Sequence, residues 1–481
     1  MNKQIRLAGL AGAAFLSFTA LAGTAPMEGE HSSRRALQVA GTAPVEGEHS
    51  SRRALQVAGE KPSGSYVAHE WGTFTSIQSA DGKLLEWSPL ESSHLPAFVY
   101  NWAQPGINCV PAGRVTLVKE EMRTLQRMET PVIYFYSEEE RVVDVSVRFP
   151  EGRITEWYPQ ANRIGPSRVP ATPVVQRLDG YAHQAGLRSD LTFASLLHNE
   201  AATGDSRAYW NGIRIMPREQ NKQLESQLPA DKLGSHYFAA RQAEADYIQM
   251  EARRPTGTAA EVEKFIFYRG VGSFATALRV SISPDSAVIL ENTGKEPLRH
   301  LYVLVIEDGK GKFERVSTLD AGAQRQVLME RNDPLKTRDV LSAELCQQMA
   351  ESLTKEGLYA HEAKAMVATW RDSWFEEDGL RVLYLLPRAW TDRTLPLSLR
   401  PDPSELVRVM VGRAEVLPPQ LEERLAGRLA KAAEGNAEAR AMVVEDFRRL
   451  GRFARPAMEL AIRNANHEVQ TEAWGLLQQA R

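Results

Sequence analysis

The sequence predicts a mainly β protein with α-helical additions: β-sandwich-type domains, then a helical hairpin region, then a C-terminal HEAT-like helical tail. Three observations predict this class. Apolar and polar residues alternate along short segments between residues 66 and 330, which is the period of half-buried strands. Apolar residues recur every three or four positions within 341–378 and again from 418 onward, which is the period of amphipathic helices. The length of 481 residues allows several domains.

The first 22 residues have the features of a secretory signal peptide. Lys3 and Arg6 precede an uncharged apolar run over residues 7–21, and the small residues that end at Ala22 suit a signal peptidase. The run is shorter than the roughly 20 residues that a bilayer core requires, so we expect cleavage rather than anchoring. These features predict a periplasmic or secreted protein with no membrane attachment after cleavage.

Residues 23–62 are expected to form a low-complexity linker that contains a tandem repeat. Residues 23–40 recur as residues 41–58 with one change, Met27 to Val45, so the repeat unit has 18 residues. Two polar copies are too few to build a repeat fold. We interpret the segment as a flexible linker, and a short binding motif presented twice is the alternative.

Strand signals dominate residues 63–275, which we predict to be a β-rich domain. Four segments rich in β-branched and aromatic residues are expected strands: 67–75, 132–136, 143–149 and 264–268. The turn Pro150-Glu-Gly152 should return the chain along residues 153–158 as a hairpin. Long loops with one helix at residues 189–199 are expected within 160–235.

Three further segments complete the chain. Residues 276–335 carry short alternating runs with turn signals every 8–12 residues, which is typical of an immunoglobulin-like β-sandwich. Residues 336–417 should form an α+β segment, with two helices within 341–378. Two strands are expected after these helices, at residues 380–386 and 406–411. Residues 418–481 predict short antiparallel helices with tight connections, as in HEAT-type repeats.

Composition restricts the partners. The formal net charge is -3 and no strongly basic block occurs, so nucleic acid is not an expected partner. A protein or a carbohydrate partner remains open. The two cysteines, Cys109 and Cys346, could form a disulfide in an oxidising compartment, and two buried free thiols are the alternative.

The stretch His69-Glu-Trp-Gly72 holds the first candidate site. Neighbouring strand residues point to opposite faces of a sheet, so His69 should share a face with Trp71. Glu70 should lie on the other face, where Gly72 permits a bulge or a close backbone approach. His69 is a candidate general base or metal ligand, and a hydrogen-bonded sheet histidine is the alternative.

Glu70, Glu129 and Arg269 are further candidates for catalysis. Two carboxylates could perform glycosidase chemistry, and Arg269 could bind a carboxylate or sugar hydroxyls. The glycines after Arg269 predict a tight turn between sheets. No local metal-binding motif occurs, so a divalent metal would need dispersed ligands. The candidate ligands are His69, His94, His183, His198 and His236.

Three tryptophans are candidate ligand-binding residues: Trp71, Trp370 and Trp374. Trp370 and Trp374 are spaced as on one face of a helix, which more often indicates core than binding. The alternative is an exposed platform for a sugar ring.

Five stretches carry a resemblance to other proteins: 69–75 (HEWGTFT), 128–132 (METPV), 267–272 (FYRGVG), 373–376 (SWFE) and 410–413 (MVGR). In these stretches the chain resembles a family of uncharacterised exported bacterial proteins. The resemblance extends over about residues 67–415 and implies export, but it implies no activity, cofactor or partner. The tandem repeat is not part of it.

Two functions therefore stay open. A binding or assembly protein is favoured by the sandwich signals, the helical tail and the lack of a catalytic signature. The alternative is an exported hydrolase, with or without a metal, that acts on a polysaccharide or a peptide. The hydrolase needs His69, Glu129 and Arg269 in one concave pocket.

Overall fold

The computed structural model describes residues 65–90, 95–101, 122–165, 205–231, 234–254, 257–328 and 334–480. All of them belong to one unit of the chain, Lys61–Arg481. The predicted signal peptide, the repeat-containing linker and the helix expected at 189–199 lie outside the described residues. The predicted class, mainly β with α, is confirmed, since strands contribute more of the structure than helices.

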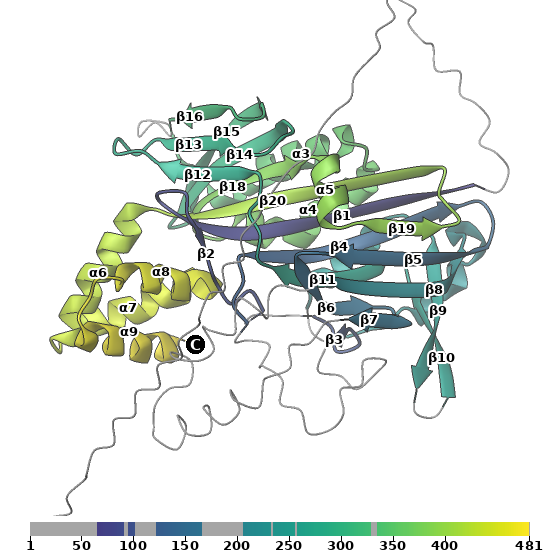
Figure 1. Cartoon of the computed structure of the whole chain (residues 1–481), viewed down its shortest axis with the longest axis horizontal. Helices are drawn as coiled ribbons and strands as arrows, with labels where there is room; N and C mark the ends of the chain where they lie inside the picture. The colour runs from purple at the N-terminus through teal and green to yellow at the C-terminus, as the bar shows by residue number, and fades with distance from the viewer. Residues whose placement is uncertain are drawn as a thin grey trace, which may run out of the picture. The chain divides into compact units, whose positions relative to one another are not determined.

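An eleven-stranded sheet forms the centre of this unit (Figure 1). Its strands, in order across the sheet, are β17 (Lys336–Thr337), β15 (Lys310–Leu319), β14 (Leu298–Glu307), β18 (Gly379–Leu386), β20 (Glu405–Leu417), β1 (Tyr66–Ser79), β4 (Gln126–Ser137), β11 (Ile266–Gly272), β6 (Gly152–Tyr158) and β3 (Tyr100–Asn101), with β2 (Leu84–Leu85) paired to β1. The two long central strands, β1 and β20, run parallel from the pair Val67–Glu405 to the pair Ser79–Leu417.

Two smaller sheets cover one face of the large sheet. The first contains β10 (Gly257–Glu263), β9 (Tyr247–Arg254), β8 (Ser206–Met216), β5 (Arg141–Phe149) and β19 (Leu397–Arg400), with β7 (Arg163–Gly165) paired to β8. The second contains β12 (Leu278–Ile282), β13 (Val288–Asn292) and β16 (Gln324–Val327). Phe74 of β1 packs against Phe149 of β5, and Gln78 of β1 donates to the Leu278 carbonyl of β12. We call this side of the large sheet the sheet face.

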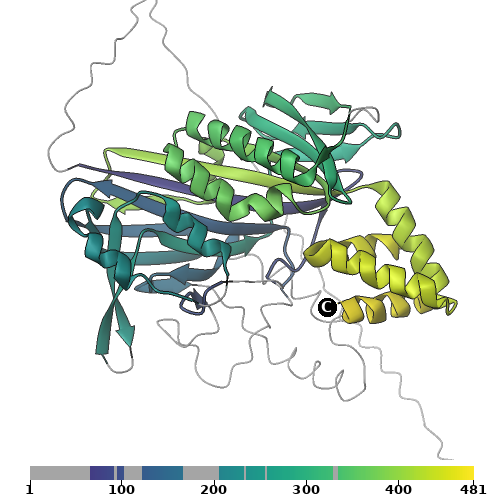
Figure 2. The ribbon, with the colours of Figure 1, turned by 180° about the vertical axis from the view of Figure 1, so that it is seen from behind.

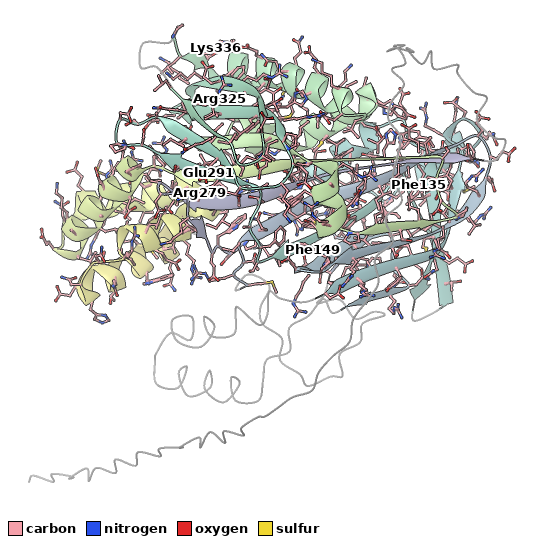
Figure 3. The ribbon with its side chains drawn as sticks, turned by 45° about the horizontal axis from the view of Figure 1, so that its top comes forward. Phe135, Phe149, Arg279, Glu291, Arg325 and Lys336 are labelled. Atoms are coloured by element: carbon pink, nitrogen blue, oxygen red, sulfur yellow. The ribbon has the colours of Figure 1, made fainter. Side chains whose placement is uncertain are left out.

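The small second sheet exposes charged side chains. Arg279 of β12 pairs with Glu291 of β13 at 3.3 Å, and both are at least one-third exposed. Arg325 of the neighbouring strand β16 is also exposed (Figure 3). This exposed ion pair is of a kind that contributes little to stability.

Helices cover the opposite face, which we call the helix face. They are α3 (Arg338–Lys355), α4 (Ala360–Phe375) and the 3-10 helix η5 (His236–Gln242), and Figure 2 shows α3 and α4 lying across the sheet. Three shorter helices lie elsewhere: η3 (Arg218–Gln220), η4 (Lys222–Gln227) and α5 (Arg388–Thr394). The helix face is apolar beneath α4, since Met366 and Trp374 of α4 are fully buried.

The chain ends in a helical tail with its own apolar core. Its elements are α6 (Pro419–Ala433), α7 (Ala437–Leu450), η6 (Gly451–Phe453), α8 (Ala454–Ala461) and α9 (His467–Ala480). Asn436 caps α7 by accepting from the Ala439 amide, and Gly451 ends it with φ of 52°. Trp87 joins this core by packing on Phe453, with ring centroids 5.7 Å apart. The HEAT-like assignment stays a prediction.

Two local predictions are wrong. β5 and β6 form at the expected residues but make no hairpin, because β5 pairs with β8 and β19 while β6 pairs with β11 and β3. The turn between them crosses from one layer to the next, and the Phe149 ring occupies the space beside Gly152. The glycines after Arg269 also form no turn, since β11 continues through Gly272.

The predicted domain boundaries at residues 275 and 335 do not separate sheets. β14, β15 and β17 belong to the same sheet as β1 and β4, so segments predicted as separate domains share strands of one sheet. The strands predicted as an immunoglobulin-like sandwich divide between this sheet and the three-stranded one. That assignment stays a prediction.

Candidate functional site

The motif in β1 divides over the two faces of the large sheet, as the alternation predicts. His69 and Trp71 lie on the helix face and Glu70 on the sheet face. The pairing of β1 with β4 shifts register opposite Gly72, and the extra residue lies in β4. A Cβ on Gly72 would stand 2.9 Å from the Cα of Pro131, so the glycine is needed for a close backbone approach.

His69 is held by a buried carboxylate. Its Nδ1 lies 2.7 Å from Glu362 of α4, and both side chains are almost fully buried. Glu362 also accepts hydrogen bonds of 2.7 Å from the Tyr136 hydroxyl and the Tyr359 amide. Burial, together with the Glu362 carboxylate, raises the pKa of Tyr136 far above its ordinary value, so this phenol remains a donor. The Tyr359 ring stands 4.4 Å from the His69 ring and covers it.

Glu70 is the partner of a buried arginine on the opposite face. Arg408 of β20 donates to Glu70 at 2.5 Å, and the Tyr268 hydroxyl donates to the same carboxylate. Arg408 also donates to Asp392 at 2.7 Å and to the Leu395 carbonyl at 2.6 Å. Burial disfavours the charged guanidinium, but Glu70 and Tyr268 outweigh it, so the pKa of Arg408 is raised. The Glu70 carboxylate therefore accepts hydrogen bonds from both Arg408 and Tyr268.

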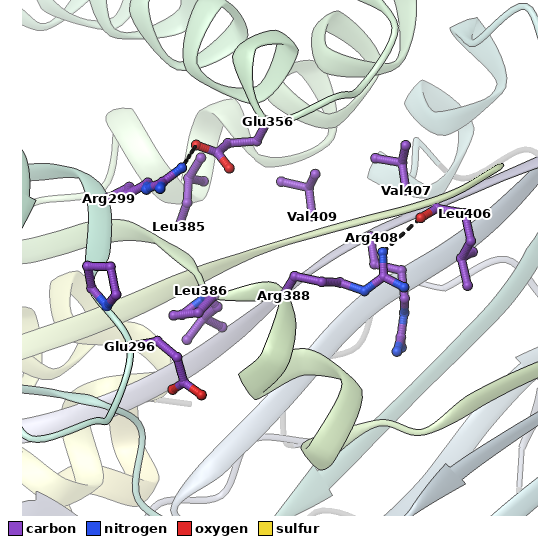
Figure 4. A pocket seen from close by; sticks show the side chains of 12 residues that line it. Glu296, Arg299, Glu356, Leu385, Leu386, Arg388, Leu406, Val407, Arg408 and Val409 are labelled. Atoms are coloured by element: carbon purple, nitrogen blue, oxygen red, sulfur yellow. Dashed lines mark hydrogen bonds and ion pairs between the residues drawn. The ribbon is translucent and has the colours of Figure 1, made fainter. Parts of the chain in front are cut away.

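A pocket of about 400 Å³, which we call the edge pocket, opens beside Arg408 (Figure 4). Its apolar lining is contributed by Leu385, Leu386, Leu406, Val407 and Val409. Its charged lining is contributed by Glu296, Arg299, Glu356, Arg388 and Arg408. Arg299 lies 3.6 Å from Glu356 on one side, and Arg388 donates to the Leu406 carbonyl at 2.8 Å on the other.

A second group of charges lies further along the helix face. Glu129 is buried 3.8 Å from Arg127 and 3.8 Å from Arg452 of η6. Arg269 pairs with Glu156 at 2.9 Å. Burial lowers the pKa of Arg127 to about 9 and that of Arg269 to about 10. Burial alone would raise the pKa of Glu129, but the neighbouring guanidiniums, that of Arg127 first, outweigh it and lower the pKa.

His236 of η5 joins this group. Its ring lies 5.2 Å from the Trp370 ring, and burial is the main cause that lowers its pKa to about 4. Glu129 and Arg269 both act on this pKa, so the structure brings three of the predicted candidates together. His69 is not among them. It lies four residues along β1 from Thr73, the β1 neighbour of Glu129, which is about 13 Å along a strand.

The charged group continues across β20 toward the tail. Arg413 donates to Glu415 and to Glu377 at 2.8 Å each, and Arg381 of β18 donates to Glu415 at 3.0 Å. Arg452 reaches Glu377 at 3.4 Å. Burial would raise the pKa of Glu377, but these guanidiniums, that of Arg452 first, outweigh it and lower the pKa to about 2.

These charges border a pocket of about 740 Å³ between the tail and the ends of the sheets, which we call the tail pocket. Its apolar lining includes Ile282, Val288, Val305, Leu380, Leu421 and Phe453. Its charged lining includes Glu377, Glu415, Arg424, Arg448, Arg449 and Arg452. Arg449 is held at 2.6 Å by Asp308 and at 2.8 Å by Asp378.

The remaining candidates that the structure describes do not form a site. The three tryptophans Trp71, Trp370 and Trp374 are at most 4 % exposed and belong to the core, which is the favoured interpretation of Trp370 and Trp374; the alternative, an exposed sugar platform, is wrong. Cys346 is a free, half-buried thiol, and burial raises its pKa. Four candidates lie outside the described residues: His94, Cys109, His183 and His198.

The described residues offer no metal centre and no membrane span. None of their histidines, cysteines and carboxylates gather in threes or more as a metal ion would need. In the same part of the chain, every helix is too short or too polar to cross a bilayer.

No family model matches the chain, and no curated protein matches it. The resemblance to exported bacterial proteins therefore stays a prediction.

Sequence reasoning missed the arginines of β20. Arg408, Arg413 and Glu415 interrupt an otherwise apolar strand, Leu406 to Val416, and an arginine inside a buried strand requires a carboxylate partner. That interruption is a signal that could have been used. It does not tell which carboxylate is the partner, because Glu70 is 338 residues away from Arg408.

Proposed function

We propose that the protein is an exported binding protein whose ligand occupies the tail pocket. The observation that carries the proposal is the pocket itself. Its volume of about 740 Å³ lies within the range typical of small-molecule sites, and it lies between two packed parts of the chain, where such sites often occur.

The lining favours an amphipathic ligand. The floor is apolar, and two acidic residues on the sheet side are already paired with arginines: Glu377 with Arg413 and Arg452, and Glu415 with Arg381. Glu307, which is exposed, lies on the same side of the pocket. The tail contributes Arg424, which is exposed, and Arg448, whose ion pair with Glu445 at 3.7 Å is exposed and weak. An organic carboxylate with an apolar body would place its body on the floor and its head between these two arginines.

The charged network supports binding rather than catalysis. A buried ion pair is weak evidence for stability, because desolvation offsets its Coulomb energy. What the network gives the pocket is rigidity: Arg413 and Arg381 are at most 1 % exposed and are fixed by several acceptors each. A rigid wall lowers the entropic cost of binding.

Export rests on the predicted signal peptide and is part of the proposal, as are the immunoglobulin-like and HEAT-like assignments. The hydrolase alternative gains no support from the geometry. Neither His69 nor Glu129 lines the edge pocket or the tail pocket, and the His69 imidazole is covered by Tyr359.

The test uses dodecanoate as the probe. The mature chain from Gly23 is titrated with dodecanoate by isothermal titration calorimetry, and one molecule per chain should bind. Replacing both rim arginines, Arg424→Ala with Arg448→Ala, should weaken binding at least tenfold, since a hydrogen bond to a charged group contributes about 1.5–3 kcal/mol.

Arg463→Ala is the matched control. Arg463 lies on the tail, is 55 % exposed and does not line the tail pocket, so its replacement should leave the affinity unchanged. Equal weakening in the control and the double variant, or no binding by the wild type, would refute the proposed site. Val305→Phe, which fills the floor, should abolish binding without changing the fold.

A further inference from the structure

Strand β20 has two neighbouring strands along one part of its length and one neighbouring strand along the rest. From Met410 to Val416 it lies between β1 and β18, but from Glu405 to Val409 only β1 pairs with it among the described residues. The last pair with β18 is Leu386–Met410. β18 ends there because Pro387 follows, has no N–H to donate, and precedes α5. A sheet interior therefore contains a short open edge.

The direction of the open backbone groups follows from two observations. The carbonyls of Val411 and Arg413 accept from the side-chain hydroxyls of Thr73 and Ser76 of β1, at 2.8 and 3.5 Å, so these carbonyls point toward β1 and odd-numbered residues of β20 direct their backbone groups toward that strand. Backbone groups alternate along a strand. Even-numbered residues therefore face the β18 side.

The contact of Leu406 agrees with this direction. Its carbonyl accepts from Arg388, which follows β18 in the chain. By the same alternation, the N–H of Leu406 and both backbone groups of Arg408 face the gap beyond the end of β18. This is the edge pocket, which both residues line.

The side chains that line the edge pocket lie on both sides of the sheet plane (Figure 4). Val407 and Val409 lie on the helix face, near Arg299 and Glu356. Leu406 lies on the sheet face. The side chains of an inserted strand would alternate between these two sides.

We infer that the edge pocket binds an extended peptide segment of a partner protein, which adds a strand to β20. The open ladder positions of Leu406 and Arg408 select a peptide backbone, because strand addition satisfies donors and acceptors in alternation. Leu406 and Val407 are half-exposed and apolar, so they favour small apolar side chains in the segment.

Charge complementarity adds an acidic residue to the expected segment. Arg299 and Arg388 are 58 % and 44 % exposed at the rim of the edge pocket, and their ion pairs with Glu356 at 3.6 Å and Asp392 at 2.8 Å are of the exposed kind that contributes little, so either arginine can bind an acidic side chain of the segment instead. Natural proteins usually protect open edges with charges or cover them. Here the end of β18 and helix α5 enclose the edge, so one chain fits where a second sheet could not.

The test starts from a random eight-residue peptide library displayed on phage and selected on the mature chain. Selected peptides should alternate small apolar residues with polar ones and contain an acidic residue. A synthetic copy should bind, and hydrogen exchange at the Arg408 amide should slow at least tenfold in its presence. Failure to select any peptide, or unchanged exchange at Arg408, would overturn the inference.

Two matched pairs separate strand addition from other binding. The backbone amides of the peptide are methylated either at all odd-numbered or at all even-numbered residues. One of these two methylated peptides should lose binding and the other should bind as the parent does. On the protein, Leu406→Pro removes the N–H that faces the pocket and should weaken binding at least tenfold. Leu406→Ala keeps this N–H and should retain most of the affinity. If both methylated peptides bind as the parent does, the backbone is not what the site recognises. The tail variants Arg424→Ala and Arg448→Ala should have no effect.

Discussion

Replacing His236 by glutamine should remove a large part of the pH dependence of stability. His236 lies against Trp370, and burial lowers its pKa from 6.5 to about 4. Glu129 opposes the shift. Three guanidiniums add to it: those of Arg269, Arg127 and Arg452. Because the unfolded chain binds the proton more tightly than the folded protein, stability should fall as the pH drops from about 6.5 toward 4.

The size of the effect follows from the two pKa values. With 6.5 in the unfolded chain and about 4 in the folded protein, linkage gives a loss of about 2 kcal/mol between about pH 7.5 and about pH 5. Glutamine does not titrate, so the His236→Gln variant should lack this loss. The measurement is urea denaturation of the wild type and the variant at both pH values.

His361→Gln is the control, because burial also lowers the pKa of His361 while leaving it outside the Glu129 group. The His361→Gln variant should keep the part of the pH-dependent loss of stability that is due to His236. If His236→Gln loses as much stability as the wild type between the two pH values, burial of His236 does not govern this window and the reasoning is wrong.

Three further predictions concern the buried contacts. Glu70→Leu removes the buried carboxylate from the Arg408 guanidinium, which keeps only the half-exposed Asp392, and should cost about 3 kcal/mol in urea denaturation, while Glu70→Leu with Arg408→Met should recover most of this loss; an equal loss in the single and the double variant would contradict the pairing. Gly72→Ala should cost about 1–3 kcal/mol, seen as a lower Tm, because its Cβ would meet the proline backbone of β4; an unchanged Tm would mean that the strands relax. Deleting residues 419–481 should expose Ile77 and cause aggregation in size-exclusion chromatography; a folded monodisperse remainder would show that the tail covers no essential core.

Local patterns predicted the elements well and their partners poorly. The strands at 132–136 and 143–149 and the helices within 341–378 follow from residue type and period, which depend on neighbours in the sequence. The parallel pairing of β1 with β20 joins residues more than 300 positions apart, and no local pattern reports it. The false hairpin after Phe149 has the same origin, because a turn signal shows that the chain reverses but not which layer it enters.

The candidate site was predicted in part for the same reason. Alternation along β1 correctly separated His69 from Glu70, because strand geometry alone decides it. The meeting of Glu129, Arg269 and His236 depends on how β4, β11 and η5 pack, which spacing does not contain. The sequence could therefore supply the residue types of the site, and tertiary packing selected which of them meet.

The way in which these groups are satisfied argues for binding. A general base needs an open lone pair beside a substrate, and a nucleophile needs access. Glu70 is occupied by Arg408 and Tyr268, and Glu362 by His69, Tyr136 and Tyr359. Charges fixed in this way hold pocket walls in one geometry. Both pockets have such walls, that of the edge pocket through Arg408. The exposed groups at the pocket rims then determine which ligand binds. These groups are arginines in the tail pocket and backbone groups in the edge pocket.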